Sequence, residues 1–151
     1  MDGKETPQQV FQGIWNEKGY RPVEIDTTEV KQVLTMILED YEFGKRLRHI
    51  ENPNWRVIFN IHYDVIRELC DQLMRFKNLK TSNHQGLFAF IALNFNDLDD
   101  WEFFETIRTM RNKNKYMALD ISKNMWQQVE LRLDLNVSLI SKQIKELLEG
   151  C

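Results

Sequence analysis

The residues best suited to chemistry lie in one short stretch, Arg111-Asn112-Lys113-Asn114-Lys115-Tyr116. It places three cationic side chains and two amides within five positions, at the end of an aromatic-rich segment that begins near Leu98. A guanidinium can hold a phosphate through two parallel hydrogen bonds. The stretch is therefore the first candidate for a site that binds an anion.

The periodicity of this segment divides its polar side chains between two faces. At about 100° per residue, a helix gathers one apolar sector from Phe103, Phe104, Ile107 and Met110. Arg111 and Asn114 continue that sector, whereas Asn112 and Tyr116 fall on the opposite face. An unpaired buried charge costs several kcal/mol, so a guanidinium at the core edge needs a partner. Arg111 is thus either a helix-end cation paired with a neighbouring carboxylate or a group that binds an anionic ligand.

Other polar residues have ordinary structural interpretations. His62 lies within an apolar stripe, which favours a hydrogen-bonded core histidine over a ligand-binding one. His84 stands where a helix should begin, so capping or a surface contact is expected. One helix face carries Asp64, Arg67, Glu68 and Asp71, whose spacing suits helical ion pairs on a solvated surface.

Composition and missing motifs exclude several classes of function. No histidine follows a glutamate by three positions, and Cys-x-x-Cys, His-Glu-x-x-His and glycine-rich phosphate loops are absent. We therefore predict no metal and no cofactor. Cys70 and Cys151 are the only cysteines, which argues against a disulfide framework and for a reducing cytoplasm. Apolar runs are too short for a signal peptide or a membrane span.

The elements that must position these residues are helical. A chain of 151 residues suits one domain. Asp26 with Glu29 forms a capping box, Asn54 follows Pro53, and Ser82 or Asn83 can cap a shorter helix. We expect one helix from 26 to between 44 and 48, others over 54–78 and 83–95, and a fourth from about 98 to 116. A last helix, capped by Asp120, should run to 148. The predicted fold is an all-α, antiparallel four-helix up-and-down bundle with an additional short helix, no strands, and an N-terminal arm (1–25) packed on the body (26–151).

Four segments also resemble one protein family: Asn60-Ile61-His62-Tyr63-Asp64-Val65-Ile66-Arg67, then Phe76-Lys77-Asn78-Leu79-Lys80, Asn83-His84, and Arg111 to Tyr116. They resemble the HEPN-domain proteins, small bundles named for higher eukaryotes and prokaryotes nucleotide-binding. In one prokaryotic branch a Tyr-Asp-x-x-Arg helix leads to a lysine-containing turn and an Asn-His pair. Its last hallmark is Arg-Asn-x-x-x-His, which reads Arg-Asn-x-x-x-Tyr in this chain.

The resemblance implies a site and a function. Many members are metal-independent ribonucleases whose Arg and His meet in a cleft shared by two subunits. They often act as toxins beside a nucleotidyltransferase antitoxin, or in antiviral defence; members with Tyr in place of His have no established nuclease activity. By this resemblance Arg111, Asn112 and Tyr116 form the catalytic set. The supporting candidates are Asp64, Arg67, Lys80, His84 and Lys115.

Tyr116 leaves the enzymatic activity open. A tyrosine with a pKa of about 10 is a poor general base beside a histidine at about 6.5. A second tyrosine of the toxin pattern is replaced by Ala118. His84 or His62 would be a substitute base if either reaches the cleft. A local basic patch nevertheless surrounds Arg111 in a chain of net charge −3.

Two hypotheses follow. One is a HEPN-like homodimer that binds RNA or a nucleotide near Arg111 to Tyr116, with or without ribonuclease activity of the toxin or defence type. The alternative is a catalytically inactive dimeric helical module that docks a partner such as a nucleotidyltransferase. Neither involves a membrane.

Overall fold

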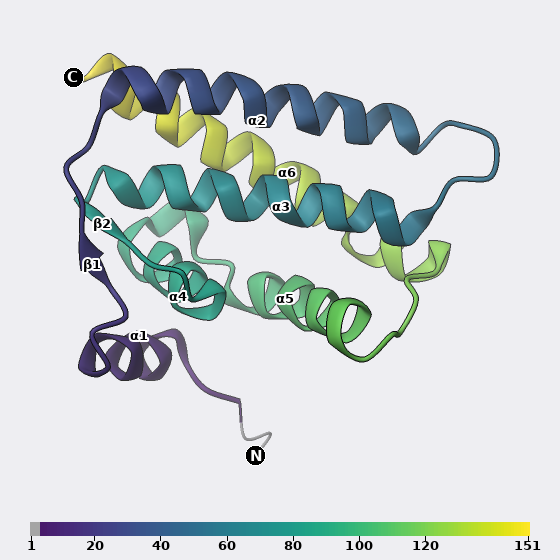
Figure 1. Cartoon of the computed structure of the whole chain (residues 1–151), viewed down its shortest axis with the longest axis horizontal. Coiled ribbons are helices and arrows are strands. Elements are labelled where there is room, and N and C mark those ends of the chain that lie inside the picture. Colours follow the sequence, from purple (N-terminus) through teal and green to yellow (C-terminus); the bar gives the residue numbers. More distant parts are fainter. Residues whose placement is uncertain (1–3) are drawn as a thin grey trace.

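The computed structural model describes residues 4–151, which form six α-helices, one short 3-10 helix and two strands. In chain order these are α1 (Pro7–Asn16), β1 (Arg21–Pro22), α2 (Thr27–Leu47), α3 (Trp55–Arg75), β2 (Leu79–Lys80), α4 (His84–Asn94), η1 (Asn96–Leu98), α5 (Trp101–Tyr116) and α6 (Lys123–Glu149). Helices α2, α3, α5 and α6 alternate in direction along the long axis (Figure 1). The all-α prediction is confirmed.

Side-chain caps set most helix starts where the sequence predicts them. Asp26 accepts a hydrogen bond from the Glu29 N–H at 3.1 Å, and Asn54 accepts one from Val57 at 3.1 Å. Asn83 does the same for the Gly86 N–H at 2.8 Å, which fixes the start of α4 at His84. Each cap satisfies one of the backbone donors that a helix N-terminus leaves free.

The prediction that Asp120 caps the last helix is wrong. Ser122 is the cap and accepts from the Met125 N–H at 3.2 Å, so α6 begins at Lys123. Asp120 instead accepts from the Ile121 N–H at 2.9 Å and pairs with Arg56 at 3.5 Å. Burial of Ile121 holds the chain against the core before the helix starts, which delays its first turn.

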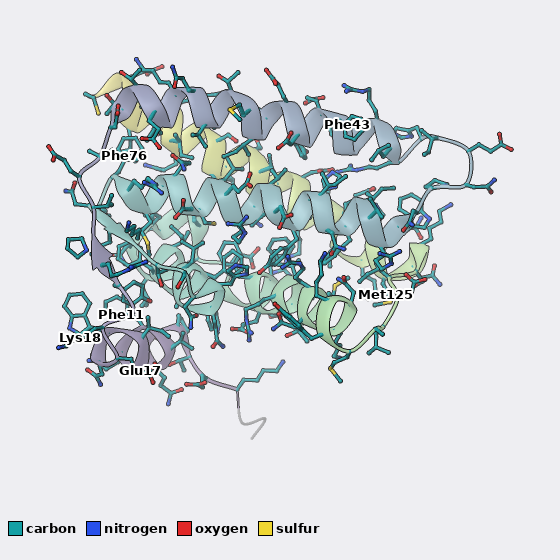
Figure 2. All side chains as sticks on the ribbon, viewed as in Figure 1. Phe11, Glu17, Lys18, Phe43, Phe76 and Met125 are labelled. Atoms are coloured by element: carbon teal, nitrogen blue, oxygen red, sulfur yellow. The ribbon has the colours of Figure 1, made fainter. Side chains whose placement is uncertain are left out.

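The predicted arm contains a helix that the sequence analysis missed. Thr6 and Gln9 form a capping box around Pro7, the first residue of α1. Phe11, labelled in Figure 2, lies 6.3 Å from Phe90 of α4 between ring centroids, so α1 packs on the body. Residues 1–3 of the arm lie outside the described residues. The division into 1–25 and 26–151 stays a prediction.

The expectation of no strands is also wrong in one place. Arg21 pairs with Lys80 and Pro22 with Leu79 in a two-stranded antiparallel ribbon that joins the arm to the turn after α3. A ribbon of this length shows no alternating pattern in the sequence.

Helix α3 lies at the centre of the core and contacts α2, α6, α4 and α5. Helix α4 is apolar on nearly every side because it is enclosed by α1, α3 and α5. Phe88 of α4 stacks on Phe104 of α5 with ring centroids 4.9 Å apart. This packing brings the start of α4 and the last turns of α5 to the same face of α3. Across residues 4–151, no helix is both long enough and apolar enough to cross a membrane.

Candidate functional site

Arg111 lies on α5 and points toward α3. Its guanidinium carbon is 5.1 Å from the centre of the Tyr63 ring, and its Nη2 is 3.9 Å from the Asp64 Oδ1. That separation is longer than a hydrogen bond, so the charge of Arg111 is only weakly neutralised. The side chain is 19% exposed. Arg111 is therefore oriented by an aromatic face, and its terminal nitrogens keep hydrogen-bonding capacity for another anion.

Tyr63 links Arg111 to His84. The Tyr63 hydroxyl lies 3.0 Å from the Nδ1 of His84, the first residue of α4. Burial raises the pKa of Tyr63 to about 12, although nearby arginines oppose this, so the phenol stays protonated. The pKa of His84 is lowered, first by burial and then by the positive charges of Arg67, Arg111 and Arg108. His84 is thus neutral at neutral pH.

Two more arginines complete what we call the Arg111 cluster: Tyr63, Arg67, His84, Arg108 and Arg111. Arg108 Nη2 contacts the Glu105 Oε2 at 2.7 Å. Arg67 is held loosely, at 3.9 Å from Asp64 and 3.5 Å from Glu68. The three arginines have as many neighbouring carboxylates, so the formal charges balance. Of the ion pairs that the described residues form here, only the one between Arg108 and Glu105 is at hydrogen-bonding distance. The helical ion pairs expected on α3 are therefore present, and Asp64 also reaches α5.

The helical-wheel prediction for the end of α5 is confirmed for Arg111, Asn114 and Tyr116, whereas Asn112 is half-buried and its predicted place on the outer face stays a prediction. Asn114 points inward and donates to the Asn60 Oδ1 of α3 at 3.1 Å. Tyr116 is 81% exposed and points away. The same period therefore separates Tyr116 from Arg111, so the predicted catalytic set of Arg111, Asn112 and Tyr116 does not converge in one chain. In residues 4–151, no hydrogen bond or ion pair joins Asn112 or Tyr116 to Arg111.

The supporting candidates divide in the same way. Asp64, Arg67 and His84 all lie at the Arg111 cluster. Lys80 pairs with Arg21 in the ribbon, and Lys115 is exposed; no described ion pair connects either lysine to the cluster. Sequence reasoning singled out neither the ring of Tyr63 as the support of Arg111 nor its hydroxyl as the partner of His84.

A shallow groove of about 280 Å³ borders the cluster between α2 and α3. Its lining includes Asp64, the carboxylate paired with Arg111, and Glu68, whose pKa is raised by burial. It also includes Phe43 of α2, which is 49% exposed and is labelled in Figure 2. Carboxylate oxygens and an accessible aromatic ring thus lie beside the weakly paired arginines.

A second polar network was missed entirely. We call it the Arg48 network: Tyr41, Arg48, His62 and Asp134. Arg48 holds both carboxylate oxygens of Asp134, at 2.9 Å and 2.8 Å, and Tyr41 donates to the same carboxylate at 2.6 Å. The network joins α2, α3 and α6. Arg48 and Asp134 are 86 positions apart in the sequence, and no local motif marks such a pairing.

His62 is fully satisfied within this network. Arg48 can only donate, so the His62 Nε2 at 2.8 Å accepts, and Nδ1 carries the proton that it donates to the Ile58 carbonyl at 2.7 Å. Burial lowers the pKa of His62 to about 4. A Cβ added at Gly44 would lie 2.7 Å from His62 Cε1, so glycine is needed for this close approach. The interpretation of His62 as a core histidine is confirmed, which removes it as a substitute base.

Charges in the Arg48 network reinforce one another. Burial opposes ionisation of Asp134, but hydrogen bonds from Arg48 and Tyr41 outweigh it and lower the pKa of Asp134. Burial likewise opposes the charge on Arg48, but the hydrogen bond and the charge of Asp134 outweigh it, so the pKa of Arg48 rises.

Within the described chain, no group of three or more His, Cys, Asp or Glu side chains is placed to hold a metal ion.

Comparison of the chain with protein-family models, curated proteins and solved structures gives no significant match. The resemblance to HEPN-domain proteins therefore stays a prediction that depends on the residues quoted above.

Proposed function

We propose that the chain is a HEPN-like protein that binds RNA or a nucleotide through a phosphate group at the Arg111 cluster. The supporting observation is the state of Arg111: it lies against Tyr63, with its nearest carboxylate 3.9 Å away and with two further arginines beside it. A phosphate oxygen at hydrogen-bonding distance would satisfy this guanidinium better than Asp64 does.

The neighbouring groove supports a nucleotide rather than a bare anion. Carboxylates such as Asp64 and Glu68 can accept hydrogen bonds from ribose hydroxyls, and Phe43 can stack on a base. A ligand with its phosphate on Arg111 and its ribose beside Asp64 would occupy both features. Phe43→Ala should therefore weaken binding of a nucleoside monophosphate and leave affinity for inorganic phosphate unchanged.

The deciding experiment compares two arginines of similar exposure. Arg111→Ala should weaken binding of a labelled single-stranded RNA by about 10-fold to 100-fold, as expected for the loss of a charge-assisted hydrogen-bond pair. Arg75→Ala is the matched control, because Arg75 is 26% exposed and pairs with Asp71 outside the cluster. Fluorescence anisotropy at about 0.15 M salt measures both.

Melting temperatures show whether a loss of binding comes from the missing side chain or from unfolding of the variant. Both variants should melt within a few degrees of the wild type. Equal loss of binding in the two variants would show non-specific attraction, and no binding by the wild type would contradict the proposal. If Arg111→Ala collapses the fold, Arg111→Lys distinguishes the roles, because lysine keeps the charge and loses the bidentate geometry.

The alternative function is a dimeric interaction module that docks a partner such as a nucleotidyltransferase. It is favoured by three exposed apolar side chains where α5 ends: Tyr116, Met117 and Leu119, which are 81%, 64% and 49% exposed. Exposed apolar groups of this kind are typical of protein contacts. If the wild type is a homodimer through this surface, Met117→Lys should lower the molecular mass measured by light scattering to that of the monomer. A variant that keeps the mass of the wild type throughout a dilution series argues against this surface.

Location and biological role belong to the same proposal. Cys70 and Cys151 are both free thiols, which suits a cytoplasmic protein. The toxin or defence role that the resemblance implies is associated with ribonuclease activity.

A further inference from the structure

The groove between α2 and α3 presents hydrogen-bond acceptors to a ligand. Its lining consists of three carboxylates and three apolar side chains: Asp40, Asp64, Glu68, Phe43, Ile61 and Val65. An ionised carboxylate accepts hydrogen bonds through both oxygens and donates none. The backbone N–H groups of these residues lie inside α2 and α3, where the helices use them. Among the described residues, the lining therefore favours ligand groups that carry N–H or O–H.

Asp40 is the carboxylate of this groove that is left without a close partner. Asp64 is shared between Arg67 and Arg111, and Glu68 lies 3.5 Å from Arg67. In residues 4–151, Asp40 forms no hydrogen bond and no ion pair. Burial raises the pKa of Glu68, and the negative charges of Asp64 and Asp40 add to this against Arg67. Asp40 of α2 thus faces the carboxylates of α3 across the groove.

Phe43 provides a flat apolar surface beside Asp40. It follows Asp40 by three positions on α2, so the two side chains share one face of the helix. Arg46 supports the ring from the same helix, with its guanidinium carbon 5.6 Å from the ring centre, and Phe43 is still 49% exposed. The groove volume of about 280 Å³ is near the lower end of the usual range for ligand pockets. A planar base stacked on Phe43 would therefore have its edge beside Asp40.

The four RNA bases present different edges to a carboxylate. Guanine has two adjacent donors, the ring N1–H and the exocyclic amino group on C2, which match the two oxygens of one carboxylate. In adenine and cytosine, an amino group lies beside a ring nitrogen that accepts, so one carboxylate oxygen would face a lone pair. Uracil has one N–H between two carbonyl oxygens. Guanine is the base that gives Asp40 two hydrogen bonds without an opposing acceptor.

We propose that this groove makes the site selective for guanine nucleotides and that Asp40 determines the selectivity. The inference rests on the proposed nucleotide binding, with the phosphate at the Arg111 cluster. Asp64 belongs to both features, since it lies 3.9 Å from Arg111 and lines the groove. Asp40 accepts from N1–H and from the amino group of a guanine stacked on Phe43, while Asp64 and Glu68 accept from the ribose hydroxyls. A different base would leave Asp40 imperfectly paired.

The first test varies the base and leaves the protein unchanged. Isothermal titration calorimetry compares the nucleoside 5′-monophosphates of guanosine, inosine, adenosine and xanthosine on the full chain. Guanosine monophosphate should bind at least about 10-fold more tightly than adenosine monophosphate, as expected for one bidentate pair. Inosine monophosphate keeps N1–H but lacks the amino group, so its affinity should fall between these two. Xanthosine monophosphate has a carbonyl oxygen in place of the amino group and should bind no better than adenosine monophosphate.

The second test exchanges the selectivity at one atom. Asp40→Asn replaces a carboxylate oxygen by an amide NH₂ of similar size. It should weaken binding of guanosine monophosphate by about 10-fold and strengthen binding of xanthosine monophosphate by a similar factor, because the amide can donate to the xanthine carbonyl and still accept from N1–H. Loss of folding cannot produce such an exchange. Glu39→Gln is the matched control, since Glu39 is an equally exposed neighbour on α2 that lines the groove toward α6. It should leave all four affinities unchanged.

The outcomes separate this inference from the proposed function. Equal affinity for guanosine and adenosine monophosphates, in a manner that depends on Arg111, overturns the guanine selectivity and leaves nucleotide binding standing. A selectivity that is the same in Asp40→Asn as in the wild type overturns the role of Asp40. Absence of binding of every nucleotide and of RNA by the wild type contradicts the proposed function itself.

Discussion

The protein builds two clusters from the same four side-chain types and uses them differently. Each places a tyrosine, an arginine and a histidine beside an aspartate. Tyr41, Arg48, His62 and Asp134 form the Arg48 network, and Tyr63, Arg111 and His84 of the Arg111 cluster lie beside Asp64. In the first, arginine and aspartate make two hydrogen bonds of 2.8–2.9 Å. In the second, the corresponding pair is 3.9 Å apart.

The two differ in how many of their hydrogen-bonding groups have close partners, although the Arg48 Nε of the first is also buried without one in the described chain. Both ring nitrogens of His62 have hydrogen-bond partners, whereas in residues 4–151 only the Nδ1 of His84 has one. Both carboxylate oxygens of Asp134 are bound by Arg48, whereas Asp64 is shared between Arg67 and Arg111 without a close contact to either. A saturated buried network stabilises the packing of helices. An unsaturated one has donors and acceptors left for a ligand.

The largest effect should come from breaking the saturated cluster. Asp134→Ala leaves Arg48, 9% exposed, with Glu130 at 3.7 Å as its remaining carboxylate, and should lower the free energy of unfolding by about 3 kcal/mol. Asp64→Ala should cost less than about 1 kcal/mol, since its contacts are long and its side chain is 45% exposed. Urea titration of both variants measures the contrast. Equal losses would show that the two clusters are energetically alike.

The two histidines should differ in how they respond to pH. The unfolded chain protonates His62 below a pKa of about 6.5, but the folded chain does so only near 4. Stability from neutral His62 is thus complete above pH 6.5 and declines as pH falls toward 4, by about 3 kcal/mol in total. Denaturation at a series of pH values should show this slope. It should persist in His84→Gln and flatten in His62→Asn; a slope that follows His84 instead would contradict it.

The smallest expected difference in unfolding free energy is between substitutions of Tyr41 and Tyr63. Tyr41→Phe removes a hydrogen bond to the charged Asp134 and should cost about 2 kcal/mol of unfolding free energy. Tyr63→Phe removes a neutral hydrogen bond to His84 and should cost about 1 kcal/mol. Thermal melts of the two variants check the order. If Tyr63→Phe is the more damaging, the Arg111 cluster stabilises the fold more than its contacts indicate.

Local sequence signals predicted much of this molecule. The caps at Asp26, Asn54 and Asn83 mark helix starts because a side-chain oxygen within three residues satisfies a free backbone N–H. Thr6 and Gln9 carry the same signal for α1, but a helix of 10 residues is too short to show a sustained apolar period. Asp120 failed as a cap because Ser122 lies closer to the first free N–H groups once Ile121 is buried.

The candidate site was predictable in part for the same reason. A helical period places Arg111 and Asn114 on the inner face of α5 and Tyr116 on the outer face, and this depends on position within one helix. The partner of Arg111 depends on packing between helices. Nothing local indicates that Tyr63 lies under its guanidinium or that Asp64 is its nearest carboxylate.

The sequence by itself therefore determined the helices, most of their caps and the face on which each polar residue lies, because these follow from hydrogen bonds and periods within a few residues. Only the tertiary structure decided which histidine is free. His62 and His84 have the same side chain. The packing of α2 and α6 against α3 places Arg48, which binds Asp134, at the Nε2 of His62. The packing of α3, α4 and α5 places Tyr63 at the Nδ1 of His84, near the arginines, and no hydrogen bond to its Nε2 is found in residues 4–151. Contacts between residues far apart in the chain arise from how apolar faces bury one another, and no local pattern encodes that outcome.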